Sequence, residues 1–340
     1  MKGHPVRFDT PAMQWTCLKA CCRFGNAMGS IRQRKVSAFG TVGASVTGMN
    51  APSTASRPNL APHAPQEAVF GPSVHNSWTL RAEGVSLVRT APPPRPVWLG
   101  ATPQPVQIDL ARTALVVVDM QNDFCHAEGW FAQKGLNIEA ARRPIPVLQA
   151  LLPAWRAAGA QVLWLNWGIR ADGLNLSPTV HFKGKGRADG VGYGERSPID
   201  HGPSLVQGEW GAQLIDELRV APTDITVHKH RLSGFWDSEL DSVLRHQGIT
   251  TLLFAGINTD RCVFSTLQDA PFLGYDCVLL EEACATSSPD SVTHSVLYLV
   301  RLLHGFVASA ADLMAALPEA GAGAAPSSFV STPLDPTPGV

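Results

Sequence analysis

Strand and helix patterns alternate along residues 106–318, and this alternation constrains the fold more than any other feature of the sequence. Short apolar runs rich in β-branched residues predict strands buried on both faces, at residues 114–118, 162–165, 224–228, 251–255, 275–280 and 305–309. Apolar residues at helical spacing predict helices between them, at residues 144–158, 211–218, 237–247, 261–273 and 289–304. Such alternation is typical of a parallel sheet with helices on both faces.

The ends of two predicted helices carry local signals, and one long stretch breaks the alternation. Asp237 and Gly248 are expected to cap and to end the helix at 237–247, and Pro271 is expected to interrupt or kink the next one. Residues 168–210 contain many glycines and little periodicity. A loop of this length inside a compact domain is usually functional or mobile, so we expect a cover over a site or an oligomer contact.

The two flanks of this region differ from it in composition. Residues 1–48 hold seven Lys and Arg and one acid, residues 49–77 are rich in Pro, Ala and Ser, and residues 91–105 read APPPRPVWLGATPQP. Such segments bury little apolar surface, so residues 1–105 are expected to be a largely disordered extension and Pro-rich arm. Residues 319–340 are expected to be a flexible tail. Three interpretations of residues 1–48 stay open: a transit-type presequence, sequence upstream of a start at Met49, and an extension without function.

The charge and the cysteine content exclude several classes of protein. The 27 basic and 28 acidic residues give a net charge of −1, so the chain has no overall electrostatic attraction for nucleic acid or anionic membranes. No apolar run approaches the ~20 residues of a membrane-spanning helix. Seven cysteines are few and odd in number, which favours a reducing, cytoplasmic location over a disulfide-rich secreted fold.

Three chemically reactive residues follow three of the predicted strands. Asp119 follows the first strand in VVVDMQNDFC, Lys229 follows the third in TVHKHR, and Cys262 follows the fourth in AGINTDRCV. Ligands in open parallel sheets bind beyond the carboxyl ends of the strands, near the switch in strand order. We therefore expect these three side chains to share one site.

This combination of side chains suits nucleophilic catalysis. A thiolate attacks carbonyl carbons, and both an adjacent ammonium and a helix N-terminus favour the thiolate. An aspartate beside the thiol takes its proton and later protonates a leaving amine. The backbone amides of Asn258 and Cys262 are placed to hold an oxyanion, and Gly256 permits the tight turn before them.

Each of these residues also has a structural interpretation. A single Asp after a strand is most often a turn or cap residue, and a single Lys there is most often solvated. Cys277 and Cys284 are expected to be inert core thiols, whereas Cys125 follows the first strand and is a rival for the same pocket. The three residues together, each at the same edge of the sheet, favour the catalytic interpretation.

The quoted segments resemble the isochorismatase-like cysteine hydrolases over residues 106–315. The family pattern is a strand that ends in Asp, a Lys after the third strand, and G-x-x-T-x-x-C-V after the fourth, matched here by Asp119, Lys229 and residues 256–263. The resemblance implies an α/β fold, a three-layer α/β/α sandwich whose mostly parallel six-stranded sheet has the Rossmann-like order 3-2-1-4-5-6. It also implies assembly as a dimer or tetramer.

The resemblance further implies roles for individual residues. Asp119 is the general acid and base, Lys229 stabilises the charged states, and Cys262 is the nucleophile. The peptide between Ile257 and Asn258 is expected to be cis and to direct the Asn258 amide at the oxyanion.

Two segments, KHRLSGFWDSELDSVLRHQGI and GEWGAQLIDEL, are most similar to the ureide-cleaving branch of the family, which includes ureidoacrylate amidohydrolase and biuret hydrolase. The nicotinamidase branch carries an Asp/His metal cluster after the second strand, but the stretch LNWGIRADGLNLSP has no histidine, so no metal and no cofactor is expected. The vinyl-ether-cleaving isochorismatases lack the catalytic thiol, so Cys262 argues against them. Asn258 replaces the small or apolar residues that are commoner there, which leaves the fine substrate specificity open.

We therefore predict a metal-free amidohydrolase that cleaves a small ureide or carbamoyl compound through a thioester, as a homo-oligomer without nucleic-acid or membrane partners. The predicted pocket residues are Gln121, Phe124, Trp164, Asn166, Trp167, Phe235 and Trp236. Instead of lining the pocket, Gln121 could stabilise a turn and Trp164 could belong to the hydrophobic core; the sequence leaves both alternatives open. Direct roles stay open for His126, His228, His230 and Glu281. Alternative functions are an amidase on a nicotinamide-like or lactam substrate, and a non-catalytic binding protein that keeps the fold.

Overall fold

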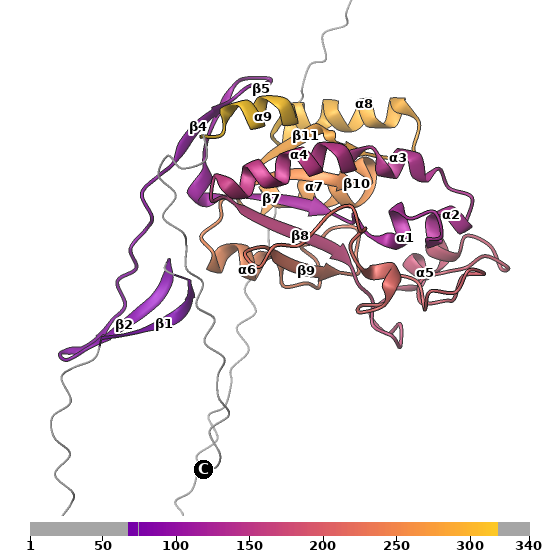
Figure 1. The fold of residues 1–340 in the computed structure, drawn as a ribbon, viewed down its shortest axis with the longest axis horizontal. Helices are drawn as coiled ribbons and strands as arrows, with labels where there is room; N and C mark the ends of the chain where they lie inside the picture. Colours follow the sequence, from indigo (N-terminus) through magenta and orange to yellow (C-terminus); the bar gives the residue numbers. More distant parts are fainter. Residues whose placement is uncertain (1–66, 74, 319–340) are drawn as a thin grey trace, which may run out of the picture. The chain divides into compact units, whose positions relative to one another are not determined.

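The computed structural model describes residues 67–73 and 75–318, so the predictions for residues 1–66 and 319–340 lie outside the described residues. A central sheet has seven strands in the order β5-β12-β11-β10-β7-β8-β9 (Figure 1). Six of them are parallel neighbours: β7 (Thr113–Val118), β8 (Gln161–Trp167), β9 (Ile225–Lys229), β10 (Thr251–Ile257), β11 (Asp276–Ala285) and β12 (Phe306–Ala308). Numbered along the chain, these six run 3-2-1-4-5-6, which confirms the predicted order. The short strand β5 (Ala101–Thr102) adds an antiparallel edge that the sequence did not predict.

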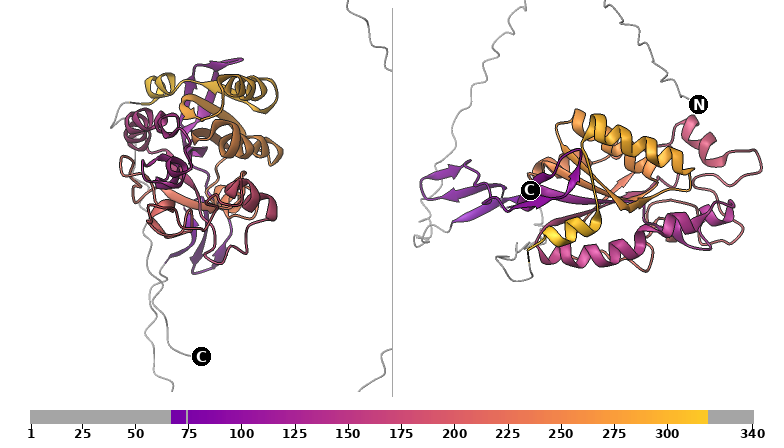
Figure 2. Two further views of the ribbon diagram at one scale, coloured as in Figure 1. Left: turned by 90° about the vertical axis from the view of Figure 1, so that its right-hand side faces the viewer. Right: turned by 90° about the horizontal axis from the view of Figure 1, so that it is seen from above.

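Helices cover both faces of this sheet, which confirms the predicted three layers. One layer contains α3 (Ile138–Arg142), α4 (Pro144–Ala157) and α9 (Ala310–Ala316), and the other contains α6 (Leu240–His246), α7 (Phe264–Phe272) and α8 (Asp290–Leu299) (Figure 2). A π-helical turn, η3 (Thr259–Val263), precedes α7, and a second, η4 (Val300–His304), continues α8. None of the helices in the described ranges is long and apolar enough to cross a membrane.

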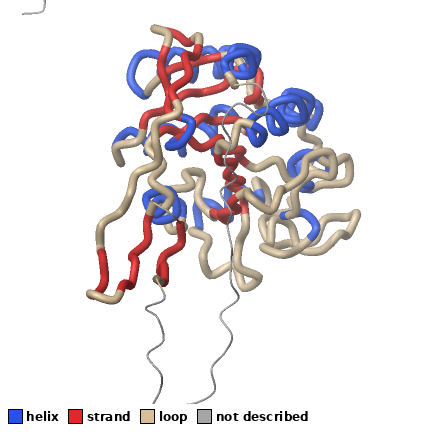
Figure 3. The backbone as a smooth tube through the Cα atoms, turned by 60° about the vertical axis from the view of Figure 1, so that its left-hand side comes forward, coloured by secondary structure: helices blue, strands red, loops and turns tan. Residues whose placement is uncertain are grey.

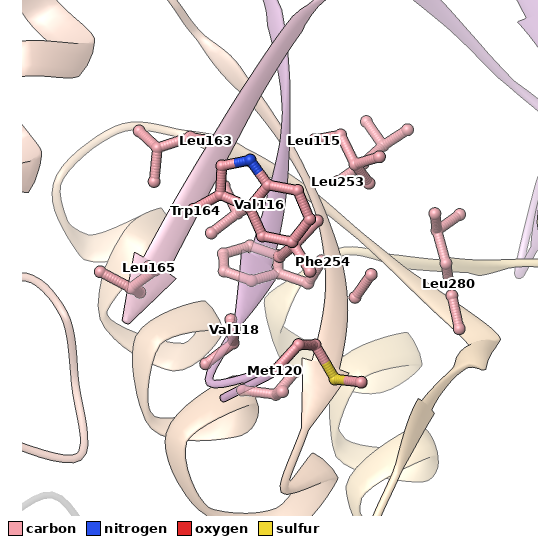
Figure 4. Close-up of a cluster of buried hydrophobic side chains, with 14 of the residues drawn as sticks. Leu115, Val116, Val118, Met120, Leu163, Trp164, Leu165, Leu253, Phe254 and Leu280 are labelled. Atoms are coloured by element: carbon pink, nitrogen blue, oxygen red, sulfur yellow. The ribbon is translucent and has the colours of Figure 1, made fainter. Parts of the chain in front are cut away.

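The core lies between these layers. Every residue of β7 and of β10 is buried, as expected of central strands covered by helices on both faces. Trp164 belongs to this core, where its side chain is fully buried on β8 (Figure 4). Its indole Nε1 donates to Asp224 Oδ2 at 2.8 Å, and its position in the middle of β8 places it well before the strand end. The prediction that Trp164 lines the pocket is therefore wrong.

The N-terminal arm contains strands that the prediction of disorder missed. β1 (Ala68–Ser73), β2 (Asn76–Arg81) and β3 (Gly84–Ser86) form a separate antiparallel sheet, and β4 (Pro96–Leu99) pairs with β6 (Val106–Asp109) (Figure 3). Main-chain pairing organises these segments, which the Pro-rich composition did not reveal. Arg95 also fixes the end of the arm, because its guanidinium donates to the carbonyls of Ala158 and Gly159.

Several predicted helices differ from the observed ones. Residues 211–218 form only the 3-10 turn η2 (Trp210–Ala212). The helix predicted from 237 begins at Leu240, and Asp237 does not cap it, since Asp237 has a φ of 57° and Glu239 occupies the N-cap. Pro271 lies in the last turn of α7 and does not interrupt it. The remaining short elements are η1 (Leu110–Arg112), α1 (Asn122–Cys125), α2 (Trp130–Gln133) and α5 (Pro178–Lys185).

Candidate active site

Asp119 follows β7 directly and is held in an uncommon backbone conformation. Its φ of 52° lies in the left-handed region, which Asp adopts more readily than most residues. Its amide donates to the carbonyl of Leu165 at 3.0 Å, so the turn is tied to the neighbouring strand β8. The carboxylate is thereby fixed at the carboxyl edge of the sheet, with a side chain that is almost fully buried.

Lys229 reaches Asp119 across an intervening strand. It is the last residue of β9, and β8 lies between β9 and β7, so the two backbones are about 9–10 Å apart. The long aliphatic stem spans this gap, and Nζ lies 3.0 Å from Asp119 Oδ2. On the way it passes Trp167, its register partner on β8, with Nζ 4.3 Å from the ring centre. The ammonium also donates to the carbonyl of Arg231 at 3.3 Å, so the buried charge has several partners.

Cys262 lies in the turn η3, immediately after β10, which is the other neighbour of β7. Its buried thiol lies close enough to Asp119 and Lys229 for both charges to shift its pKa. The peptide between Ile257 and Asn258, just before this turn, is cis. Thr266 holds the turn in place, because its hydroxyl donates to the Cys262 carbonyl at 2.7 Å and accepts from the Gly234 amide at 3.0 Å.

Burial dominates the electrostatics of these three groups. Burial, and after it the Asp119 carboxylate, raises the pKa of the Cys262 thiol to about 12, although the Lys229 ammonium acts in the opposite direction. Burial also raises the pKa of Asp119 against the lowering effect of Lys229. For Lys229 burial favours a lower pKa, but Asp119 and Cys262 outweigh it and the pKa is raised. Burial therefore favours the protonated thiol, whereas the sequence suggested that its surroundings favour the thiolate.

Four buried polar atoms without a hydrogen-bond partner among the described residues lie at the ends of β7, β8 and β10. They are Asp119 Oδ1, Asn166 Oδ1, Trp167 Nε1 and Thr259 Oγ1. Buried polar groups are nearly always paired in native proteins, so a group of orphans at one edge of a sheet needs an explanation. A bound polar molecule would supply the missing partners, which makes this edge the candidate binding site.

Residues 168–210, the cover segment, bring a further aromatic side chain to this site. The Tyr193 ring stacks on Trp167, with centroids 5.2 Å apart and an interplanar angle of 18°, and it also contacts Trp130. Burial raises the pKa of the Tyr193 phenol, and the nearby Cys262 and Asp119 act in the same direction. Sequence reasoning expected residues 168–210 to be a cover over the site or an oligomer contact, but it did not identify Tyr193, because an aperiodic loop carries no signal for the direction of one side chain.

Several of the predicted pocket residues are not brought to the thiol. Gln121 is buried, but its amide donates to the carbonyls of Trp167 and Ala212 and accepts from the Trp167 amide, so it holds the backbone. Phe235 stacks on Tyr275, which precedes β11 at the opposite edge of the sheet. Trp236 is 62% exposed and donates to Asp269 at a surface hollow. Phe124 is buried against Phe131, and its contact with a substrate stays a prediction.

The structure also shows the surroundings of Cys125, the rival thiol, and of the residues whose roles the sequence left open. Cys125 Sγ lies 3.8 Å from the carbonyl of Ala141 on α3, which gives it a structural contact of its own. His126 packs against Trp210 and accepts from the Glu128 amide. Burial lowers the pKa values of His228 and His230, and Glu281 is exposed. Within residues 67–73 and 75–318, no three His, Cys, Asp or Glu side chains cluster as metal ligands.

Comparison with known proteins adds to this geometry. A model of the isochorismatase domain matches residues 113–312, more than half of the chain. The chain belongs to the isochorismatase family. The predicted resemblance is thus confirmed, and the protein is a hydrolase of that family.

Two curated members of the family show how far the similarity extends. Ureidoacrylate amidohydrolase RutB of Caulobacter segnis is 37% identical over 221 residues, which cover 64% of this chain and 90% of that protein. The RutB protein of Rhizobium rhizogenes is 36% identical over 228 residues, covering 66% and 91%. The isochorismatase-family chain therefore has additional sequence that these relatives do not match.

Solved structures of the family agree with the fold. A cysteine hydrolase from Pseudomonas syringae pv. phaseolicola superposes with a TM-score of 0.52 at 26% identity, covering 62% of this chain and 94% of that one. An isochorismatase family protein from Desulfovibrio vulgaris gives a TM-score of 0.50 at 30% identity, covering 59% and 96%.

Proposed function

We propose that this hydrolase is a cysteine amidohydrolase that cleaves a C–N bond of a small ureide or carbamoyl compound through a thioester. The observation that carries the proposal is a buried site in which Lys229 Nζ lies 3.0 Å from Asp119 Oδ2 and the Cys262 thiol is close enough for both charges to shift its pKa. The names of the curated relatives, which are ureidoacrylate amidohydrolases, support the class of substrate.

In the first half-reaction, Asp119 accepts the proton of the Cys262 thiol as the sulfur attacks the substrate carbonyl. Because the pKa of the thiol is about 12, proton transfer accompanies the attack, and no thiolate needs to accumulate beforehand. The amides of Asn258 and Cys262 hold the oxyanion, and the Lys229 ammonium keeps the region electrically balanced. When the intermediate collapses, Asp119 protonates the leaving nitrogen, which departs as ammonia or an amine.

In the second half-reaction, a water molecule replaces the departed amine beside Asp119. The carboxylate accepts a proton from this water as its oxygen attacks the thioester carbonyl. The C–S bond then breaks, the sulfur regains a proton from Asp119, and the acid is released. A ureide substrate gives a carbamic acid at this step.

Asn166, Trp167 and Tyr193 are the proposed contacts for the substrate. Asn166 Oδ1 is an unpaired acceptor and Trp167 Nε1 an unpaired donor at this edge of the sheet, so each is available to an N–H or a C=O of a ureide. The stacked rings of Trp167 and Tyr193 offer a flat wall, which suits a planar conjugated group.

A panel of substrates tests the reaction class. Ammonia release would be measured with biuret, ureidoacrylate, N-carbamoyl amino acids, nicotinamide, a lactam and simple amides. We expect the highest kcat/KM among the ureides and carbamoyl compounds. Preference for nicotinamide or a lactam would replace the substrate assignment, and the absence of turnover throughout the panel would favour a binding protein.

The proposed location of the protein is the cytoplasm, where a reducing environment keeps the Cys262 thiol free of disulfides.

Replacement of the nucleophile gives the sharpest prediction. Cys262→Ala is expected to lower ammonia release at least ~10³-fold, because no other group in the site forms the thioester. The matched control is Cys277→Ala, which removes a buried thiol on β11 and should keep turnover near the wild-type level. Circular dichroism would show that both variants fold. Wild-type activity in Cys262→Ala would eliminate the assignment.

A further inference from the structure

The separate sheet β1–β3 is strongly amphipathic. Phe70 lies opposite Trp78, and Leu80 lies opposite both Ala68 and Val85. Directly opposed residues in a sheet point to the same face, and residues two apart on a strand do so as well. One face therefore carries five apolar side chains, the sheet patch: Ala68, Phe70, Trp78, Leu80 and Val85, with the polar Asn76 at the end of β2. The other face carries the polar residues Ser77, Thr79 and Ser86 together with Val69.

The sheet patch is uncovered in the single chain. Phe70 is 58% exposed, Trp78 45%, Leu80 38% and Val85 55%. A small sheet is stable in water only when its apolar face packs against something, so hydrogen bonds alone do not account for β1–β3. The sheet also lies outside residues 113–312, the part that matches the family model.

A second uncovered apolar surface lies on the helical layer. Tyr298 and Leu302 are four residues apart on the continuous stretch α8–η4, and Leu303 follows them. Phe272, at the end of α7, packs edge to face on His304, the last residue of η4, with ring centroids 6.1 Å apart. These four side chains, the helix patch, are 57–74% exposed. Apolar groups gathered in this way usually mark a contact with another molecule.

We infer that the sheet patch of one copy of this chain packs on the helix patch of a second copy, and that the exchange is mutual. A two-fold axis makes each copy both donor and acceptor of the contact, so the assembly closes as a dimer. Residues 87–95, the strap between β3 and β4, include three consecutive prolines and contain no helix or strand. An extended strap of about 3.1 Å per residue lets the sheet reach a neighbour while Arg95 holds its other end.

The size of the two patches favours this pairing over two sheets packed on each other. A large apolar side chain offers on the order of 200 Å², and about half of that is exposed at each of these positions, so a patch of four presents roughly 400–500 Å². Two sheet patches on two helix patches bury roughly 1,600–2,000 Å², the size of a standard specific interface. Two sheet patches alone would bury roughly 800–1,000 Å², which is in the range of weak contacts.

The first test measures the mass of the full chain in solution by light scattering. We expect an assembly of two copies or an even multiple, with Phe70→Glu and Leu302→Glu each halving the mass at equal concentration. Val69→Glu is the matched control, since Val69 is next to Phe70 on β1, is 66% exposed and points to the opposite face, and it should keep the wild-type mass. A monomeric wild-type chain, an unchanged mass in either patch variant, or dissociation of the control would overturn the inference.

A second test does not depend on how the Glu variants fold. Two differently tagged copies, one Trp78→Cys and the other Tyr298→Cys, would be mixed and oxidised. We expect a disulfide between the two tagged chains, and none when both copies carry Trp78→Cys. Cross-linking of Trp78→Cys to itself would overturn the inference in favour of sheet-on-sheet packing, and so would the absence of the mixed product.

Discussion

Lys229 shows how one residue type is selected by the geometry of a sheet. The ammonium must reach Asp119 from a strand two positions away, and only a long side chain with a terminal donor spans that distance. The stem is buried along Trp167, and the charge ends between a carboxylate and a carbonyl. A buried charge of this kind is tolerated because it is paired, so Lys229 and Asp119 each stabilise the charge of the other.

Lys229→Met tests this mutual dependence. The substitution keeps the length of the side chain but leaves Asp119 buried without an opposite charge, which typically costs about 3–5 kcal/mol. We expect denaturant titration to show a loss of that order in the free energy of unfolding, together with a loss of turnover. The double variant with Asp119→Asn should recover much of the stability and none of the activity. Equal stability of the single and double variants would argue against a dominant ion pair.

The raised pKa of Asp119 predicts the acid limb of the pH profile. Asp119 accepts the thiol proton only when it is ionised, so kcat/KM falls as the pH drops through its pKa. Burial raises that pKa above the ordinary 3.8, so the limb is expected above pH 3.8. Lys229 lowers the same pKa, so the residual activity of Lys229→Met should show a limb at higher pH. Initial rates between about pH 3 and pH 9 would measure both, and a limb at or below 3.8 would contradict the assignment.

The position of the proposed catalytic residues could be predicted from the sequence more readily than the pocket. Asp119, Lys229 and Cys262 follow recognisable strands, and parallel strands bring their carboxyl ends to one edge. Phe235 and Trp236 also follow a strand closely in sequence, but the segment after β9 turns away and carries them to Tyr275 and Asp269. The direction of a loop depends on tertiary contacts that composition does not encode.

At the scale of elements, the cover segment is held in place by a few buried anchors. Asp123 on α1 accepts from the amide of Trp130 at 3.0 Å and from the amide of Leu205 on the far side of the cover at 2.7 Å. The Trp130 indole and the Lys134 ammonium donate to the carbonyl of Val191, two residues before Tyr193. The position of Tyr193 against Trp167 therefore depends on contacts outside the active site.

Asp123→Asn is expected to loosen the cover. An amide has one oxygen where the carboxylate has two, so one of the two backbone N–H groups loses its acceptor, at a cost of about 1–3 kcal/mol. We expect faster limited proteolysis within residues 168–210 and a higher KM for the preferred substrate. Asp172→Asn, an exposed change in the same segment, is the control and should leave both unchanged. Identical proteolysis of the wild type and Asp123→Asn would show that the other anchors suffice.

The helix predicted at 211–218 failed for a reason that also lies at this scale. Leu214, Ile215 and Leu218 have helical spacing, but the segment is held by main-chain contacts with the residues that follow β7. The Ile215 amide donates to the Met120 carbonyl at 3.0 Å, and the side chains of Ile215 and Leu218 are buried. The apolar spacing predicted correctly that these side chains are buried. The backbone conformation was decided by the pairing with Met120 and Gln121, which the spacing does not reveal.

For the whole molecule, the sheet that positions the proposed catalytic residues is also the core that holds the domain together. β7 and β10 lie side by side, are buried throughout, and end in Asp119 and the turn of Cys262. Gly256 makes their close approach possible, because a Cβ there would lie 2.2 Å from the Val118 carbonyl oxygen. The six parallel strands were predictable from apolar runs of this kind. The edge strand β5 was not, since its two residues carry no pattern.

Phe254→Ala tests whether the site and the core fail together. Phe254 is fully buried in the middle of β10, and truncation of a buried Phe typically costs about 3–5 kcal/mol. For a domain of this size we expect the melting temperature to fall by roughly 10 °C, measured by calorimetry, with activity lost over the same temperature range. Leu174→Ala, at a position that is 80% exposed on the cover segment, should change stability by less than about 0.5 kcal/mol. If activity in Phe254→Ala disappeared well below the unfolding transition, the catalytic edge would have to open independently of the core strands that carry it.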